Sequence, residues 1–308
     1  MSLNVSALAD FNNQTAGELV VKSIMQGSTI EFATVKEGVK YLEPVNLFEV
    51  DLQIQDGFGC VTTAAGTASF TQRDLEVCQR TSYDGLCLRD LDKKYLGVMQ
   101  PEGSYNETFT LVNEYASQIV AGFQKANDQF IWTANTASGA CSNGLSQILS
   151  SATTGVVIPD AITGSAFSST NALSVIDTML ENLSADVQDR DDLTVFMSIA
   201  NFRKYIVGLR SDNNFYYDPA AIENRPNLMV AKHPYANVTV VGTVGLAGSD
   251  RVVMGPARHI VVGTDLLSDF SDFQLWYDIN SDQLKHRVVT KLGVQVAYPE
   301  FWVSNNRA

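Results

Sequence analysis

The chain has 308 residues, a net charge of −13 and a sequence pI near 4.6, and 45% of its residues are hydrophobic. This composition is globular and excludes a disordered chain, and the negative charge argues against a protein that reads nucleic-acid sequence through a basic face. No run approaches about 18 uninterrupted apolar residues, so we expect no membrane span, and residues 1–10 lack the features of a secretion signal.

Residues 1–44 are polar and contain too few large apolar side chains to form a core, so we expect an arm that lies on another surface. From Val45 the apolar residues recur with period two, which predicts a two-faced strand. Its apolar positions are Phe48, Val50, Leu52 and Ile54. A second extended run over 67–81 predicts a long hairpin, which is marginal alone in water and should pack on something else.

The strongest helix signal follows this hairpin. Ser104 and Glu107 have the spacing of a capping box, and apolar residues then recur at steps of three and four. The pattern predicts a helix over 106–132, which would be roughly 40 Å long and suits a structural spine.

The second half of the chain alternates helices and strands. We expect a helix over 171–183 capped by Thr170, a buried strand over 193–197, and a third helix capped by Ser198. Extended runs at 238–241, 251–254, 260–262, 273–279 and 284–298 then predict strands. The fold class is therefore α+β.

No motif for catalysis, cofactor binding or metal binding stands out. The three histidines, His233, His259 and His286, are scattered without metal-ligand spacing, and no phosphate loop, dinucleotide fingerprint or nucleophile elbow occurs. Acidic residues in 189–192 and 265–272 are interpreted as a solvated face. We therefore expect no catalytic residues, no cofactor and no metal.

Four cysteines, Cys60, Cys78, Cys87 and Cys141, lack the spacing of a zinc knuckle or a redox dithiol. We expect reduced, partly buried thiols, as in a cytoplasmic protein. Disulfides between subunits are the alternative.

The last long strand has one largely apolar face and one basic face. The basic positions are Lys285, Arg287 and Lys291. These cations could lie against an acidic neighbour or against DNA phosphate, and the excess of acidic residues favours the acidic neighbour.

The order of these elements resembles the major capsid protein of tailed bacteriophages, the Hong Kong 97-type fold. Residues 47–81 resemble its E-loop, 106–132 its spine helix, and 193–214 the strand, capped helix and loop of its A-domain. Residues 259–265 with 273–278 resemble the return into the P-domain, and 291–303 resemble the closing strand and tail. The resemblance covers nearly the whole chain as an ordered pattern, without an invariant signature.

The resemblance implies a domain organisation. It would comprise an N-terminal arm (1–44), an E-loop hairpin (45–82), a P-domain with the spine helix (83–160), an A-domain (161–262), P-domain return strands (263–297) and a C-terminal tail (298–308). The stretch 47–87 contains no lysine, so we do not expect the isopeptide crosslink of some family members.

The resemblance also implies a function. Subunits would join as hexamers and pentamers into an icosahedral shell that encloses double-stranded DNA without specific contacts. The shell would be assembled in the host cytoplasm and would belong to the virion, with scaffolding, portal and decoration proteins as possible partners. The contacts between subunits are expected at Phe48, Val50, Leu52, Ile54, Lys285, Arg287 and Lys291, with the apolar hairpin edge lying across a neighbour's spine helix.

Three alternatives stay open at this point. An encapsulin-type shell has the same fold and encloses cargo enzymes. A small-molecule enzyme would need a site that the sequence does not reveal. A tail-tube or decoration protein fits less well with a long spine helix.

Overall fold

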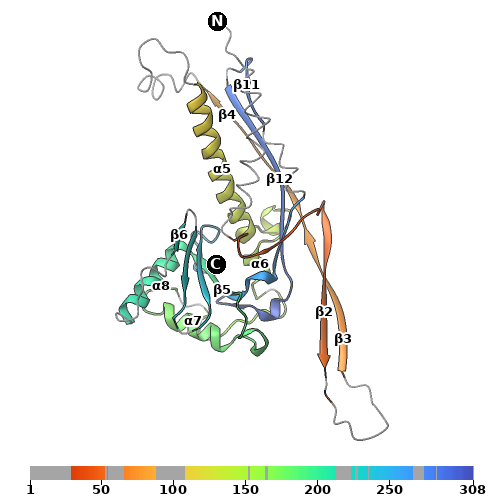
Figure 1. Cartoon of the computed structure of the whole chain (residues 1–308), viewed down its shortest axis with the longest axis vertical. Coiled ribbons are helices and arrows are strands. Elements are labelled where there is room, and N and C mark those ends of the chain that lie inside the picture. The colour runs from red at the N-terminus through yellow and green to blue at the C-terminus, as the bar shows by residue number, and fades with distance from the viewer. Residues whose placement is uncertain are drawn as a thin grey trace.

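A computed structural model describes residues 29–52, 54, 66–87, 108–151, 153–163, 166–212, 223–225, 228–234, 236–265, 274–281 and 283–307. Within these ranges, two sheets and their helices form the body, and a two-stranded hairpin extends away from it (Figure 1).

The first sheet is built around the long strand β12 (Gln283–Val296). It pairs with β4 (Cys78–Cys87), β11 (Gln274–Asp278) and β10 (Ile260–Gly263), and β1 (Thr34–Lys36) adds in parallel to β10. The apolar face predicted for β12 is buried, at Leu284, Val288, Leu292, Val294 and Val296. The helix α5 (Thr108–Thr133) runs beside β4 and β12 (Figure 1), which confirms the predicted spine.

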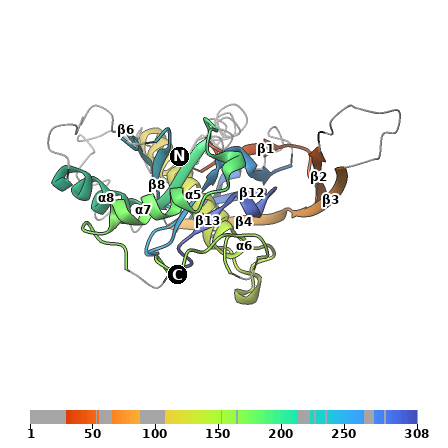
Figure 2. The same ribbon diagram turned by 90° about the horizontal axis from the view of Figure 1, so that it is seen from below.

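The second sheet has the order β13 (Val303–Ser304), β9 (Val252–Pro256), β5 (Leu193–Ser198), β8 (Thr239–Thr243), β7 (Leu228–Lys232) and β6 (Glu223–Arg225). Every residue of the central strand β5 is buried, because it lies between neighbours on both sides and under helices. The helices α7 (Ala172–Glu181) and α8 (Ile199–Asp212) pack on this sheet at the end of the molecule opposite the hairpin (Figure 2). A short helix, α6 (Leu145–Ile148), follows α5.

The hairpin consists of β2 (Leu42–Leu52) and β3 (Gly66–Glu76), paired from Leu42↔Glu76 to Leu52↔Gly66. The predicted second run does not continue in the hairpin to residue 81. The chain leaves it at Val77, because Leu75 and Val77 are buried against Val39 and Val261. Residues from Cys78 onward then pair with β12 as β4.

Within the described part of the predicted arm, residues 29–41 belong to the body and residues 42–44 begin the hairpin strand β2. Thr29, Ile30 and Val39 are buried, and β1 joins the first sheet. The sequence predicted an arm that lies on another surface, and for residues 29–41 this surface is the core of the subunit itself, where Ile30 and Val39 pack against distant residues. Residues 1–28 lie outside the described residues.

The helix caps agree with prediction in one case and differ in another. The Ser198 hydroxyl accepts a hydrogen bond from the backbone N–H of Asn201, which confirms the cap of α8. The cap of α7 is Asn171 and not Thr170, and its side-chain oxygen accepts from the backbone N–H of Ser168. The capping pair predicted at Ser104 and Glu107 lies outside the described residues.

Cys78 and Cys141 form a disulfide within the chain, so the expectation that all cysteines are reduced was wrong for this pair. The bond joins the start of β4 to the loop after α5, with Cα atoms 6.2 Å apart. Residues 63 positions apart meet only in the tertiary structure, and their spacing could not reveal the pair. Cys87 is free, and Cys60 lies outside the described residues.

Reduction of this disulfide should lower the free energy of unfolding by about 4 kcal/mol, because the closed loop restricts the unfolded chain. Denaturant unfolding with and without a reductant measures the difference. Cys78→Ser should match the reduced protein, whereas Cys87→Ser should keep the full response to reductant. Equal stability of the oxidised and reduced chains would contradict this role.

Candidate assembly surface

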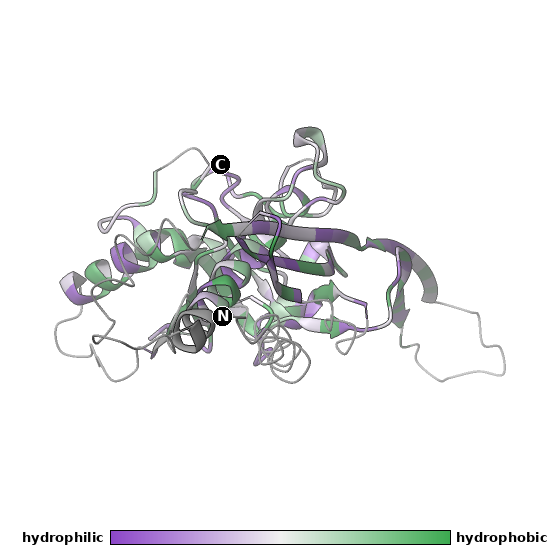
Figure 3. Ribbon diagram, turned by 90° about the horizontal axis from the view of Figure 1, so that it is seen from above, coloured by the Kyte–Doolittle hydropathy of each residue, from purple (hydrophilic) through white to green (hydrophobic). Residues whose placement is uncertain are grey.

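The hairpin carries an exposed apolar face far from the body's core. Phe48, Val50 and Leu52 are 53%, 52% and 76% exposed, and Ile54 beyond the strand is 92% exposed. The register places Phe70 opposite Phe48, with ring centroids 4.5 Å apart. From Phe48 to Leu52 of β2, hydrophobic and acidic residues alternate within a strand, whose colouring Figure 3 shows, so the period-two prediction is confirmed for this part of the hairpin.

The opposite face of the hairpin tip is polar and acidic. Glu49 lies opposite Ser69, and Asp51 lies opposite Thr67. The tip is therefore amphipathic, with its large apolar side chains unburied in the single chain. Water contact with so many large apolar groups is unfavourable, so this face is a candidate site of association.

The base of the hairpin is anchored to the body. Leu47, on the face opposite Phe48, is buried, and the Tyr298 hydroxyl donates to the Phe48 carbonyl oxygen at 3.2 Å. The tip extends from this anchor. Sequence reasoning missed Phe70, which is 78% exposed, because only the strand register shows that it joins the apolar face of Phe48.

Two of the three predicted cations of β12 have acidic partners in their own chain. Lys285 pairs with Asp278 at 2.6 Å, and Lys291 pairs with Asp265. The Lys285 ammonium holds the pKa of the Asp278 carboxyl down, at about 2. Arg287 is exposed and, among the described residues, makes no ion pair. Contact of these three residues with another subunit remains a prediction.

Arg287 lies on an exposed face at the end of the first sheet that the sequence did not reveal. Its neighbours across the strands are Tyr83 of β4 and Gln274 of β11. The Tyr83 ring is 6.1 Å from that of Trp276, and Tyr83 is 59% exposed. The face was missed because β4 was not expected beside β12.

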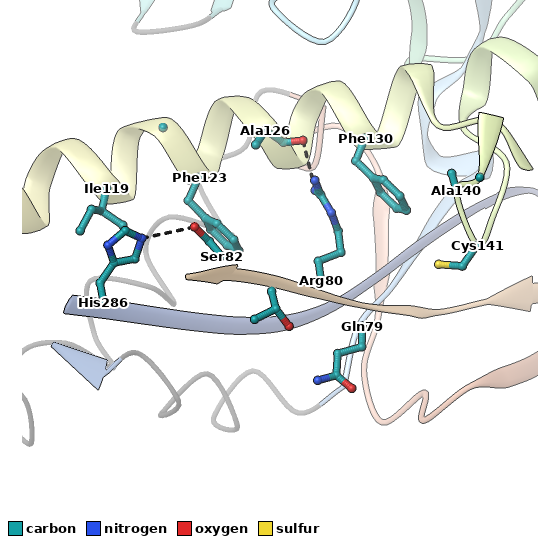
Figure 4. A pocket seen from close by; sticks show the side chains of 13 residues that line it. Gln79, Arg80, Ser82, Ile119, Phe123, Ala126, Phe130, Ala140, Cys141 and His286 are labelled. Carbon is teal, nitrogen blue, oxygen red and sulfur yellow. Dashed lines mark hydrogen bonds between the residues drawn. The ribbon is translucent and has the colours of Figure 1, made fainter. Parts of the chain in front are cut away.

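A groove of about 640 Å³ lies between α5 and β4 (Figure 4). The helix contributes Ile119, Phe123, Ala126 and Phe130 to its lining. The guanidinium of Arg80 lies 4.4 Å from the Phe130 ring centroid and donates to the Ala126 carbonyl and the Asn127 side chain. The groove thus has an apolar wall along the spine helix and a polar wall of β4 residues, Gln79, Arg80, Thr81 and Ser82.

His286 lies at one end of this groove, between the sheet and the helix. Its Nδ1 is 2.9 Å from the Tyr115 hydroxyl, and its Nε2 is 3.3 Å from the Ser82 hydroxyl (Figure 4). Burial lowers the pKa of His286, which the nearby Asp84 partly offsets, and burial also raises the pKa of Tyr115. Burial between the sheet and the helix therefore favours the neutral form of the His286 imidazole.

Acidification below about pH 6.5 should destabilise the subunit. Burial lowers the folded-state pKa of His233, His259 and His286, so the unfolded chain binds more protons between the two pKa values. Stability is then full above the unfolded pKa and is lost as the pH falls below it. Denaturant unfolding across this range measures the slope, and His286→Gln should reduce it. An unchanged slope in that variant would contradict a contribution from His286.

No group of three or more His, Cys, Asp or Glu side chains in the described ranges could hold a metal ion. Among the helices that the structure describes, none has both the length and the apolar character needed to cross a membrane.

The sequence matches no protein-family model, and no curated protein matches it either. Solved structures do match. The capsid of an empty GTA particle aligns over 90% of this chain and 88% of its own, with a TM-score of 0.57 and 12% identity. The virus-like particle from Pyrococcus furiosus aligns over 94% and 97%, with a TM-score of 0.53 and 12% identity. The capsid of Myoviridae phage XM1 aligns over 92% and 90%, with a TM-score of 0.53 and 11% identity.

These likenesses extend over nearly the whole of each chain, which agrees with the order of elements predicted from the sequence. The spine helix beside a long sheet, the second sheet with its helices and the projecting hairpin are all present. The chain therefore has the α+β fold of capsid shell subunits, the Hong Kong 97-type fold.

Proposed function

We propose that the protein is the major capsid protein of a tailed bacteriophage, a structural subunit and not an enzyme. The exposed apolar face of the hairpin carries this proposal, because a soluble single chain gains nothing from displaying Phe48, Leu52 and Phe70 to water. The fold shared with capsid subunits supports it.

We place the partner of this face in a second copy of the chain, in the groove beside α5. The wall that α5 gives to the groove is apolar, like the hairpin face, and the hairpin tip extends away from the body that carries the groove (Figure 1). When two different, complementary surfaces of one subunit bind each other in neighbouring copies, the contact is head-to-tail. Such contacts generate a closed ring when the rotation from each subunit to the next adds up to a full turn. Hexamers and pentamers are such rings, and many modest contacts of this kind would stabilise a shell.

The remaining assignments follow from this role. The shell would enclose double-stranded DNA without sequence-specific contacts, and scaffolding, portal and decoration proteins would be its partners. Assembly would take place in the host cytoplasm, and the finished protein would belong to the virion. The exposed Arg287 would contact an acidic surface of a neighbouring subunit.

The test is to express the chain alone in bacteria and to examine the lysate by sedimentation and electron microscopy. Closed shells, or hexamers and pentamers, are expected. A monomer or dimer that stays unassembled with the neighbouring phage genes co-expressed would overturn the proposal. Nuclease-protected DNA in particles made with those genes would support a phage head, whereas a packaged enzyme would identify a cargo compartment.

A further inference from the structure

A buried carboxylate joins three parts of the molecule. Asp128 of α5 is 3% exposed and lies where the helix meets the segment before β1 and the turn after β8. Its Oδ1 accepts hydrogen bonds from the backbone N–H and the hydroxyl of Thr29, at 3.2 and 2.6 Å. Its Oδ2 accepts from the Gly245 N–H at 2.7 Å and from the Thr243 hydroxyl. Each oxygen therefore holds a different segment.

Trp132, one turn further along α5, completes the junction. Its indole N–H donates to the Thr29 hydroxyl at 2.7 Å, so indole, hydroxyl and carboxylate form a chain of hydrogen bonds. Its ring lies 5.3 Å from that of Phe196 in β5. A Cβ at Gly245 would lie 2.2 Å from this ring, so glycine is required for the close approach of the turn.

The helix itself does not favour an aspartate here. Aspartate is a poor helix former in a helix interior, and Asp128 lies more than one turn before the end of α5. Within the described residues Asp128 is buried without an ion pair. The four hydrogen bonds that its carboxylate accepts must therefore offset the loss of its hydration. A residue that conflicts with local preference is expected to serve the tertiary structure.

We propose that Asp128 is a positioning residue that fixes the angle between the spine helix and the domain built on the second sheet. This inference rests on the proposed function. The hairpin and the second domain lie at opposite ends of the subunit (Figure 2). In a shell, the angle between these two parts would therefore set the curvature at which copies close. A junction held by directional hydrogen bonds selects one angle, whereas apolar packing alone tolerates several.

The first experiment compares shells of the wild type and of Asp128→Asn by electron microscopy. An asparagine has the same shape, but its NH₂ group cannot accept hydrogen bonds. The segment whose donors face that group, either at Thr29 or at Thr243 and Gly245, would therefore lose its hydrogen bonds to α5. The variant should fold and assemble into shells of mixed diameter or open sheets. The matched control is Ile176→Ala, which empties space in the core of the second domain and should keep a uniform diameter. Uniform shells from Asp128→Asn would overturn the proposal, as would an equal spread of diameters in both variants.

A second measurement does not depend on shell formation. Spin labels at Lys125→Cys in α5 and Arg210→Cys in α8, both exposed positions, report the distance between the two parts in unassembled subunits. Cys60 and Cys87 are replaced by serine in this background. Asp128→Asn should broaden the distance distribution, and a distribution as narrow as in the unsubstituted background would overturn the proposal. Failure of the wild type to assemble would count against the proposed function, while the label distances would still decide the role of Asp128.

Discussion

Replacement of Phe48 or Leu52 by aspartate is expected to abolish shell formation while leaving the subunit folded. Both side chains are more than half exposed in the single chain, so their replacement removes little of the packing that stabilises it. In the proposed contact the same positions are buried, and an unpaired carboxylate there would cost several kcal/mol. A loss of about 3 kcal/mol weakens each contact more than 100-fold, and every subunit of a shell carries the defect.

Sedimentation and electron microscopy of the purified variants measure the effect, and circular dichroism reports the fold. Ser69→Asp is the matched control, because it adds the same charge to the same hairpin on the opposite face. It is a demanding control, because the new carboxylate lies opposite Glu49 and the repulsion between the two charges weakens the hairpin itself. Normal shells from Phe48→Asp would exclude this face from the assembly contact, and loss of shells in Ser69→Asp as well would show an effect of charge alone.

Gly293→Ala should prevent stable folding. Gly293 lies in β12 where the end of the hairpin crosses the first sheet, and a Cβ there would lie 2.0 Å from the carbonyl oxygen of Glu76. The obstacle is backbone, so no side-chain rotation relieves it, and the hairpin base must shift away from Val261 and Val39. We expect a loss of at least about 4 kcal/mol, measured as the change in denaturant midpoint or as loss of soluble protein.

Gly122→Ala provides the comparison for this substitution. Gly122 is an exposed residue of α5, and a Cβ there meets nothing within 4 Å. Alanine in a helix interior is about 0.5–1 kcal/mol more favourable than glycine, so this variant should gain stability. Equal stability of Gly293→Ala and the wild type would contradict the crossing described for β12 and the hairpin.

The sequence by itself determined those elements whose period is local. The spine helix was predicted over 106–132 and is observed over Thr108–Thr133, since its apolar residues recur every three or four positions. The alternation along β12 and the apolar edge at Phe48, Val50 and Leu52 were predicted in the same way, from the period of the apolar residues. Side-chain direction in a helix or strand follows from the backbone period alone, so neighbours in the sequence suffice.

Only the tertiary structure decided which distant segments meet. The chain leaves the hairpin at Val77 so that β4 can pair with β12, which begins only at Gln283. The same long-range packing brings Cys78 to Cys141 and Thr29 to Asp128, while the strand register of the hairpin decides that Phe70 lies beside Phe48. No local period reports such contacts, because their free energy comes from burial and hydrogen bonds that exist only when the whole chain is folded.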